Sequence, residues 1–222
     1  MQTGAGVVVN TPRMSRRVLS FGAGAGVLAP PLLVAALVVA TVAEWSFLRS
    51  IGWSALERSA VEWPSVLALG RVGWLVVAVF VVCGALGLAF AVVLACELPT
   101  RAARVGAGLL GLVSSALIVV AFKADRPGAA STWHGRVHND VYPLIPSASV
   151  AAATLLAYGL WHVSAWRGQA RLALATLLVI VPALVLTNMS PVAQLARYVL
   201  FGALLLWLEG LAVALFRVAR RN

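Results

Sequence analysis

The stretch WLVVAVFVVCGALGLAFAVVLAC, residues 74–96, carries no charged side chain between its first residue and its last. A helix needs about 20 mostly apolar residues to cross the hydrocarbon core of a bilayer. The stretch meets that length, so it predicts a transmembrane helix. The chain on either side of it repeats the same pattern.

Five further stretches are long and apolar enough, or nearly so, to cross a membrane. Of the 222 residues, 62% are hydrophobic and 11% are charged, and the mean hydropathy is +0.96. A soluble domain is usually about 45–50% apolar and about 25% charged, so the composition excludes one. We expect an all-α fold, a polytopic six-helix transmembrane bundle with spans at about residues 21–42, 74–96, 105–122, 142–166, 172–187 and 198–216. Prolines at positions 30, 31 and 182 predict kinked helices rather than broken ones, because neighbouring helices can satisfy the freed carbonyls.

The basic residues orient the predicted bundle. The net charge is +10, and with the N-terminus in the cytoplasm ten of the 17 basic residues fall in inner segments and the other seven in outer segments. The positive-inside rule therefore favours two cytoplasmic termini. We predict a cytoplasmic tail over residues 1–17, one membrane domain over 18–216 and a basic cytoplasmic tail over 217–222, in the plasma membrane. Because topology accounts for the positive charge, we expect membrane lipids as partners and no nucleic acid.

The connection between the first two predicted spans, residues 43–73, is rich in tryptophan. Trp45, Trp53 and Trp63 alternate there with other apolar residues and with charges such as Glu44. Indole rings prefer the headgroup level of a membrane. We expect a long, ordered extracytoplasmic loop that either re-enters the interface or forms a lid over a lateral path for lipids or an outer cavity.

The second outer segment, residues 123–140, concentrates the polar side chains. Its sequence is KADRPGAASTWHGRVHND, in which Ser131 or Thr132 can cap a short helix. On that helix His134 and His138 are four residues apart, so they share one face about 6 Å apart.

Two imidazoles at this spacing suggest a metal site when a carboxylate is near. His134, His138 and Asp140 form the candidate zinc ligands, with Asp125 as another possible third ligand. Zinc-bound water there would attack an ester or amide. Two other interpretations stay open for His134, His138, Asp125 and Asp140: structural hydrogen bonding at the interface, and acid–base or pH-sensing chemistry without a metal. His162 lies 24 residues beyond His138 on the same span, about 36 Å away, and cannot join them.

Glu209 is the one acidic residue placed inside a predicted span. It lies eleven residues after Arg197, about 16 Å along the helix and near the midplane. A carboxylate at that depth must be paired, protonated or facing water. It is therefore a candidate for proton-linked chemistry or a protonated, hydrogen-bonded structural residue.

Two groups of outer-loop residues resemble a prokaryotic membrane family catalogued as domain of unknown function 998 (DUF998). The first group is Trp45-Ser46-Phe47-Leu48-Arg49-Ser50-Ile51-Gly52-Trp53, Trp63-Pro64-Ser65, Leu67-Ala68-Leu69-Gly70 and Gly73-Trp74, and the second is Phe122, Asp125, Thr132-Trp133-His134-Gly135, His138 and Asp140. The resemblance implies a six-helix integral membrane protein, distantly similar to the FRAG1-like group, without an established reaction or ligand. The chain departs from the family pattern at Arg126, which separates Asp125 from Pro127.

These observations leave three classes of function. We expect a non-enzymatic membrane sensor, scaffold or accessory protein without a cofactor, because no complete catalytic set is visible in the sequence. The first alternative is a membrane-embedded lipid hydrolase or transferase, with zinc at the extracytoplasmic histidine pair. The second alternative is a small proton-linked transporter that uses Glu209.

Overall fold

The computed structural model describes residues 14–56, 63–126, 128–187 and 192–221 of the chain. In that part, six helices are long and apolar enough to cross a membrane, and no strand is present. The long helices are α1 Arg16–Ala43, α3 Gly73–Glu97, α4 Arg101–Val119, α6 Leu144–Leu160, α7 Arg167–Leu186 and α8 Ala193–Arg221. The shorter elements are α2 Trp45–Ser50, α5 Trp133–Val141 and the 3₁₀ helices η1 Ser65–Leu69 and η2 Ser164–Trp166.

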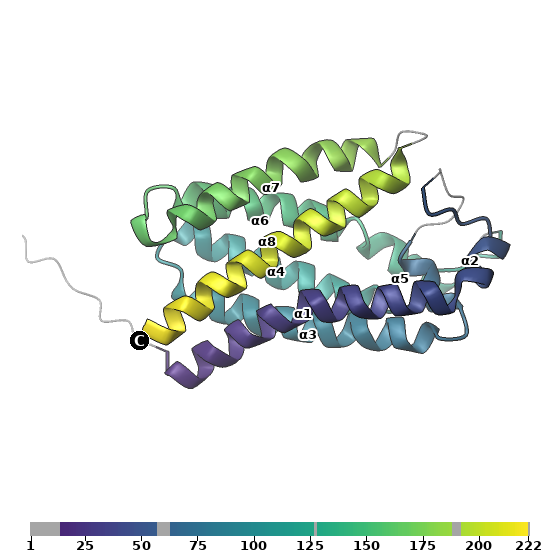
Figure 1. Ribbon diagram of the computed structural model, residues 1–222, viewed down its shortest axis with the longest axis horizontal. Coiled ribbons are helices and arrows are strands. Elements are labelled where there is room, and N and C mark those ends of the chain that lie inside the picture. Colours follow the sequence, from purple (N-terminus) through teal and green to yellow (C-terminus); the bar gives the residue numbers. More distant parts are fainter. Residues whose placement is uncertain (1–13, 57–62, 127, 188–191, 222) are drawn as a thin grey trace, which may run out of the picture.

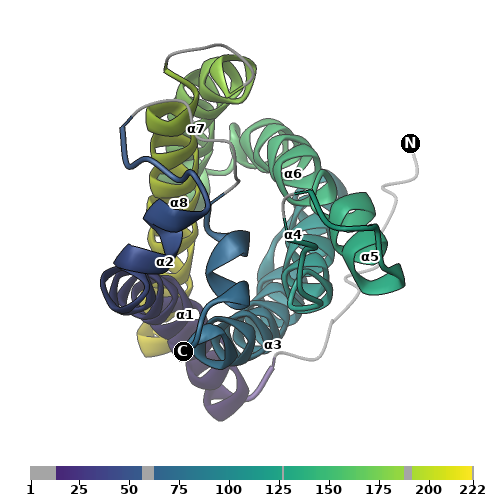
Figure 2. The same cartoon turned by 90° about the vertical axis from the view of Figure 1, so that its right-hand side faces the viewer.

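The six long helices form a closed ring, as Figure 2 shows from one end. Around the ring the order is α1, α3, α4, α6, α7 and α8, and α8 packs back against α1. The first and last long helices are therefore neighbours in space.

Small residues let the helices approach closely. Many of the fully buried positions are alanines, which bring helix backbones together as is typical of membrane bundles. Gly26 of α1 is the tightest example on the α1 and α8 side. A Cβ atom there would lie 2.8 Å from the Cβ of Ala212 in α8 and 2.6 Å from the ring of Phe90 in α3.

The ends of the helices differ from those of the apolar stretches that predict them, in both directions. The helix predicted from residue 105 begins at Arg101, because the Thr100 hydroxyl accepts a hydrogen bond from the N–H of Ala103 and caps it. The stretch predicted to run to residue 166 leaves its helix after Leu160, and Val163 takes an extended backbone. Both α1 and α7 continue as helices through their prolines.

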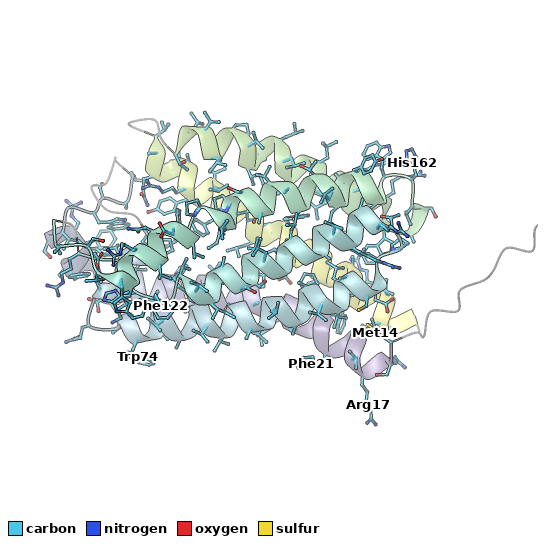
Figure 3. All side chains as sticks on the ribbon, turned by 180° about the vertical axis from the view of Figure 1, so that it is seen from behind. Met14, Arg17, Phe21, Trp74, Phe122 and His162 are labelled. Atoms are coloured by element: carbon cyan, nitrogen blue, oxygen red, sulfur yellow. The ribbon has the colours of Figure 1, made fainter. Side chains whose placement is uncertain are left out.

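The bundle has two distinct ends. The beginning of α1 and the end of α8 lie at one end, called the terminal end, whereas α2 and α5 lie at the other, called the loop end (Figure 1). Trp74 and Phe122 lie at the loop end, and Met14, Arg17 and His162 lie at the terminal end (Figure 3). The full length of the bundle therefore separates His162 from α5.

Candidate functional site

The connection between α4 and α5 folds around the carboxylate of Asp125. Its Oδ1 accepts a hydrogen bond of 2.6 Å from the hydroxyl of Thr132, and its Oδ2 accepts one of 2.9 Å from the N–H of Thr132. The same hydroxyl oxygen accepts a hydrogen bond of 3.2 Å from the N–H of Gly135, so Thr132 is the N-cap of α5. This confirms the predicted cap and attaches it to a carboxylate.

Gly135 is required by the position of Asp125. A Cβ atom at residue 135 would overlap the carboxylate of Asp125. Only a residue without a side chain leaves that space, so Gly135 and Asp125 form one packing unit on the first turn of α5.

Both histidines of α5 bond to the backbone that leaves α4. His138, which is 4% exposed, places its Nδ1 2.9 Å from the carbonyl oxygen of Val120 and 2.8 Å from that of Phe122. His134 places its Nδ1 3.1 Å from the carbonyl oxygen of Lys123. A carbonyl can only accept, so each Nδ1 carries the proton and donates it. The histidines thus satisfy carbonyls of the segment that directly follows α4, which have no partner within the helix.

We call this set of side chains the Asp125 clamp; its members are Asp125, Thr132, His134, Gly135 and His138. Two hydrogen bonds from Thr132 hold the pKa of the Asp125 carboxyl below its ordinary value of 3.8. The bond from the hydroxyl has the larger effect, and the bond from the N–H has the smaller one. The positive charges of His134 and Arg136 act in the same direction. The clamp is therefore complete when Asp125 is ionised.

The predicted zinc ligands are not brought together as a set. Asp140 is exposed at the end of α5, while His138 is buried against α4. Among the residues that the structure describes, no group of three or more His, Cys, Asp or Glu side chains is arranged to hold a metal ion. His134 and His138 do share one side of α5, as predicted. The Nδ1 atom of each ring makes a hydrogen bond to a backbone carbonyl of the segment after α4.

A second carboxylate holds the connection between α1 and α3. Glu44 is 5% exposed, and its Oε1 accepts a hydrogen bond of 2.5 Å from the N–H of Val72, the N-cap of α3. A negative charge at a helix N-terminus is stabilised by the helix dipole. A Cβ atom on Gly70 would lie 2.5 Å from Cδ of Glu44. Glu44, Gly70 and Val72 form what we call the Glu44 clamp.

The tryptophans attach the same connection to the ring. Trp53 is buried and meets Trp45 edge to face, with ring centroids 5.5 Å apart. The Nε1 of Trp63 donates a hydrogen bond of 3.0 Å to the hydroxyl of Thr41 in α1, and its ring meets Tyr198 of α8 at 5.2 Å. Trp63 therefore joins α1 to α8 at the loop end.

An apolar space, called here the axial chamber, runs along the inside of the ring. It consists of two adjoining cavities of about 90 Å³ and about 70 Å³. The two cavities share five apolar wall residues, Leu33, Val113, Leu117, Leu205 and Leu208. Pro64 and Ser65 line the cavity nearer the loop end, so η1 lies inside the mouth of the ring (Figure 2).

Glu209 lies on α8, half-buried, one turn from the contact between Ala212 and Gly26 of α1. Its Oε2 is buried and has no hydrogen-bond partner. Glu209 does not line either cavity of the axial chamber, and it is separate from both clamps.

The ring of apolar helices defines a multi-pass integral membrane protein of the helical class. Residues 27–216 match the family model described as "Protein of unknown function (DUF998)", and the chain belongs to this family. No curated protein and no solved structure matches the chain.

From the sequence, no structural role is assigned to four residues of the loop end. Glu44 and Gly70 lie 26 positions apart in a connection whose fold has no periodic pattern, so nothing in the sequence pairs them. The position of Gly135 could have indicated its role. It is the third residue after the capping Thr132, where a side chain would meet any group that is hydrogen-bonded to the capping hydroxyl. Gln194 is fully buried at the start of α8. Nothing in the sequence predicts its burial, because it is only an amide near an apolar stretch.

Proposed function

We propose that this protein is a non-enzymatic scaffold, sensor or accessory protein of the plasma membrane. The observation that carries the proposal is the use of the loop-end polar groups. Asp125, His134, His138 and Glu44 each bond to the backbone of their own connections. Groups held in this way fix the shape of an outer surface rather than meeting a reacting molecule.

The proposed topology places both termini in the cytoplasm and the loop end outside. The excess of basic residues in the segments of the terminal end supports it. Fusions of alkaline phosphatase after residue 134 and of green fluorescent protein after residue 222 test it. We expect active phosphatase and bright fluorescence; an inactive phosphatase fusion together with a dark terminal fusion would invert the topology.

Metal analysis separates the proposal from the hydrolase or transferase alternative. We expect protein purified in detergent to contain no stoichiometric zinc by plasma mass spectrometry, and its unfolding temperature to be unchanged by a chelator. One zinc per chain that is lost in the His134→Ala/His138→Ala double variant would overturn the proposal in favour of metal-dependent chemistry.

One observation favours a second candidate function, proton-linked transport through Glu209. The buried Oε2 of Glu209 lacks a partner, and an ionisable group at membrane depth marks a proton path in many transporters. Proteoliposomes that contain a pH-sensitive dye test this role. Proton flux above that of empty vesicles, abolished by Glu209→Gln, would support it, and equal flux in the two proteins would remove it.

A further inference from the structure

The axial chamber has the size and shape of a site for an apolar chain. Its wall residues run from Leu110 on α4 to Val120, the C-cap of that helix, which corresponds to a length of about 15 Å. Apolar cavities of about 150 Å³ in total stay dry and take up small apolar molecules. The two adjoining cavities, of about 90 Å³ and 70 Å³, together reach that range in a narrow, elongated form.

Two serines in the chamber wall have their hydroxyl donors occupied within their own helices. The hydroxyl of Ser149 donates to the carbonyl of Ile145 at 2.7 Å, and that of Ser114 donates to the carbonyl of Leu110 at 2.8 Å. A buried water needs two to four polar partners. With these donors occupied within their own helices, water is a poor occupant and hydrocarbon a good one.

One buried polar group lies beyond the chamber at the loop end. Gln194 is fully buried, and its Nε2 has no hydrogen-bond partner, while its Oε1 accepts from Nη1 of Arg197 at 3.3 Å. Gln194 precedes the wall residue Phe201 by seven positions, or two helical turns, so both lie on the same face of α8. The residue that carries the unpaired amide donor therefore lies on the face of α8 that lines the chamber, two turns closer to the loop end.

We propose that the axial chamber binds one hydrocarbon chain of a membrane lipid, and that Gln194 donates a hydrogen bond to an oxygen of the lipid's polar end. Lipid chains are the most abundant apolar molecules around the bundle, and their narrow form fits a space that is long along the axis. A lipid oxygen at the loop end satisfies the amide donor, whose burial without a partner is otherwise unfavourable. This proposal is independent of the scaffold function.

The first test uses a photoreactive fatty acid with a diazirine in its chain, added to the purified protein in detergent. We expect cross-links on peptides that contain Val113 and Leu208. Leu205→Trp fills the chamber, so the fatty acid and the indole ring would compete for the same space. We expect labelling to fall about tenfold, which is the change in affinity that a typical overpacking penalty produces. Leu206→Trp is the matched control, because the neighbouring Leu206 is 73% exposed on the outer side of α8.

The second test leaves the chamber volume unchanged. Native mass spectrometry of the wild-type protein should show one retained lipid, and chloroform extraction then identifies it as a phospholipid or a free fatty acid. Gln194→Leu should reduce the retained fraction several-fold, since one hydrogen bond is lost. Protein without retained lipid, labelling confined to outward-facing residues, or equal labelling of Leu205→Trp and Leu206→Trp would overturn the proposal and indicate an empty chamber.

Discussion

The two loop-end connections use the same device in different surroundings. In each, a carboxylate accepts a hydrogen bond from a backbone N–H, and a glycine leaves the room that the carboxylate occupies. Glu44 is buried and reaches 28 residues along the chain to Val72, at the start of a spanning helix. Asp125 is partly exposed and reaches seven residues to Thr132. The difference shows that the same pairing of a carboxylate and a glycine can fix the start of a transmembrane helix and can also shape a short local loop.

The energetic importance of the two clamps should differ accordingly. A buried acceptor that loses its donor keeps the full desolvation penalty, whereas an exposed one is partly repaid by water. Gly70 of the Glu44 clamp directly follows η1, which begins with the chamber residue Ser65, so we expect loss of this clamp to affect the axial chamber. Within the Asp125 clamp, His134 and His138 bond to the backbone after α4 without using Asp125, so we expect α5 to stay against α4 when Asp125 alone is lost.

The largest expected effect is that of Gly70→Ala. The new Cβ would force the buried Glu44 away from Val72, and we expect a loss of about 2–3 kcal/mol in the free energy of unfolding. Denaturant unfolding in detergent, followed by helix content, measures it. In a Glu44→Ala background the same substitution should have little further effect, since the space is then empty. Gly108→Ala, where a Cβ meets nothing within 4 Å, is the control; equal stability of the two alanine variants would contradict the clamp.

His138→Ala should have the next largest effect. It leaves the carbonyls of Val120 and Phe122 without their donor, and we expect a loss of about 2 kcal/mol. His134→Ala should lose less, about 0.5–1 kcal/mol, because its single carbonyl partner is exposed to water. Thermal unfolding of the two variants in one detergent makes the comparison. A larger loss of stability in His134→Ala than in His138→Ala would contradict the greater importance of the buried histidine.

Glu44→Gln should sharpen the comparison further. The amide oxygen can still accept from Val72, but the negative charge at the N-terminus of α3 is gone, and we expect a loss of about 1 kcal/mol. Glu44→Leu, which removes the acceptor as well, is the matched variant and should lose more. Unfolding midpoints of the two proteins decide this, and equal midpoints would mean that the hydrogen bond adds nothing.

Acid should open the Asp125 clamp with the smallest effect of the four. The folded-state pKa of Asp125 lies below its ordinary value of 3.8, so ionisation stabilises the folded protein above that pH. The contribution should disappear as the pH falls through the lowered pKa. Stability of the wild type measured from pH 6 downward should therefore decline at the acid end more steeply than that of Asp125→Asn. Asp140→Asn, an exposed position on the same helix, should keep the wild-type slope; a wild-type slope in Asp125→Asn would break the link.

The sequence predicts the spanning helices well and the loop end only in part. Apolar length alone predicts all six spans, because a bilayer requires it of any helix that crosses. It misplaces some of their ends: α4 begins earlier than predicted, because Arg101 and Arg104 interrupt the apolar stretch but not the helix that Thr100 caps, and α6 ends earlier than predicted. The cap at Thr132 and the shared face of His134 and His138 are local features, so spacing was enough to predict them.

The partners of those side chains could not be predicted. The same spacing of His134 and His138 fits a metal pair and a pair of donors to carbonyls, and only the position of α4 beside α5 distinguishes them. Glu44 finds Val72 through the fold of a connection without regular structure. The axial chamber arises from the order of the helices around the ring. The six apolar stretches have similar compositions, so this order cannot be predicted from any one of them.

The contact between α1 and α8 has a consequence for biogenesis. During synthesis α1 enters the bilayer before its ring neighbour α8 has been made. Until then the side of α1 around Gly26 faces lipid instead of Ala212. A nascent chain that stops before α8 therefore presents an unclosed bundle, in which the small-residue surface of α1 is left open to lipid.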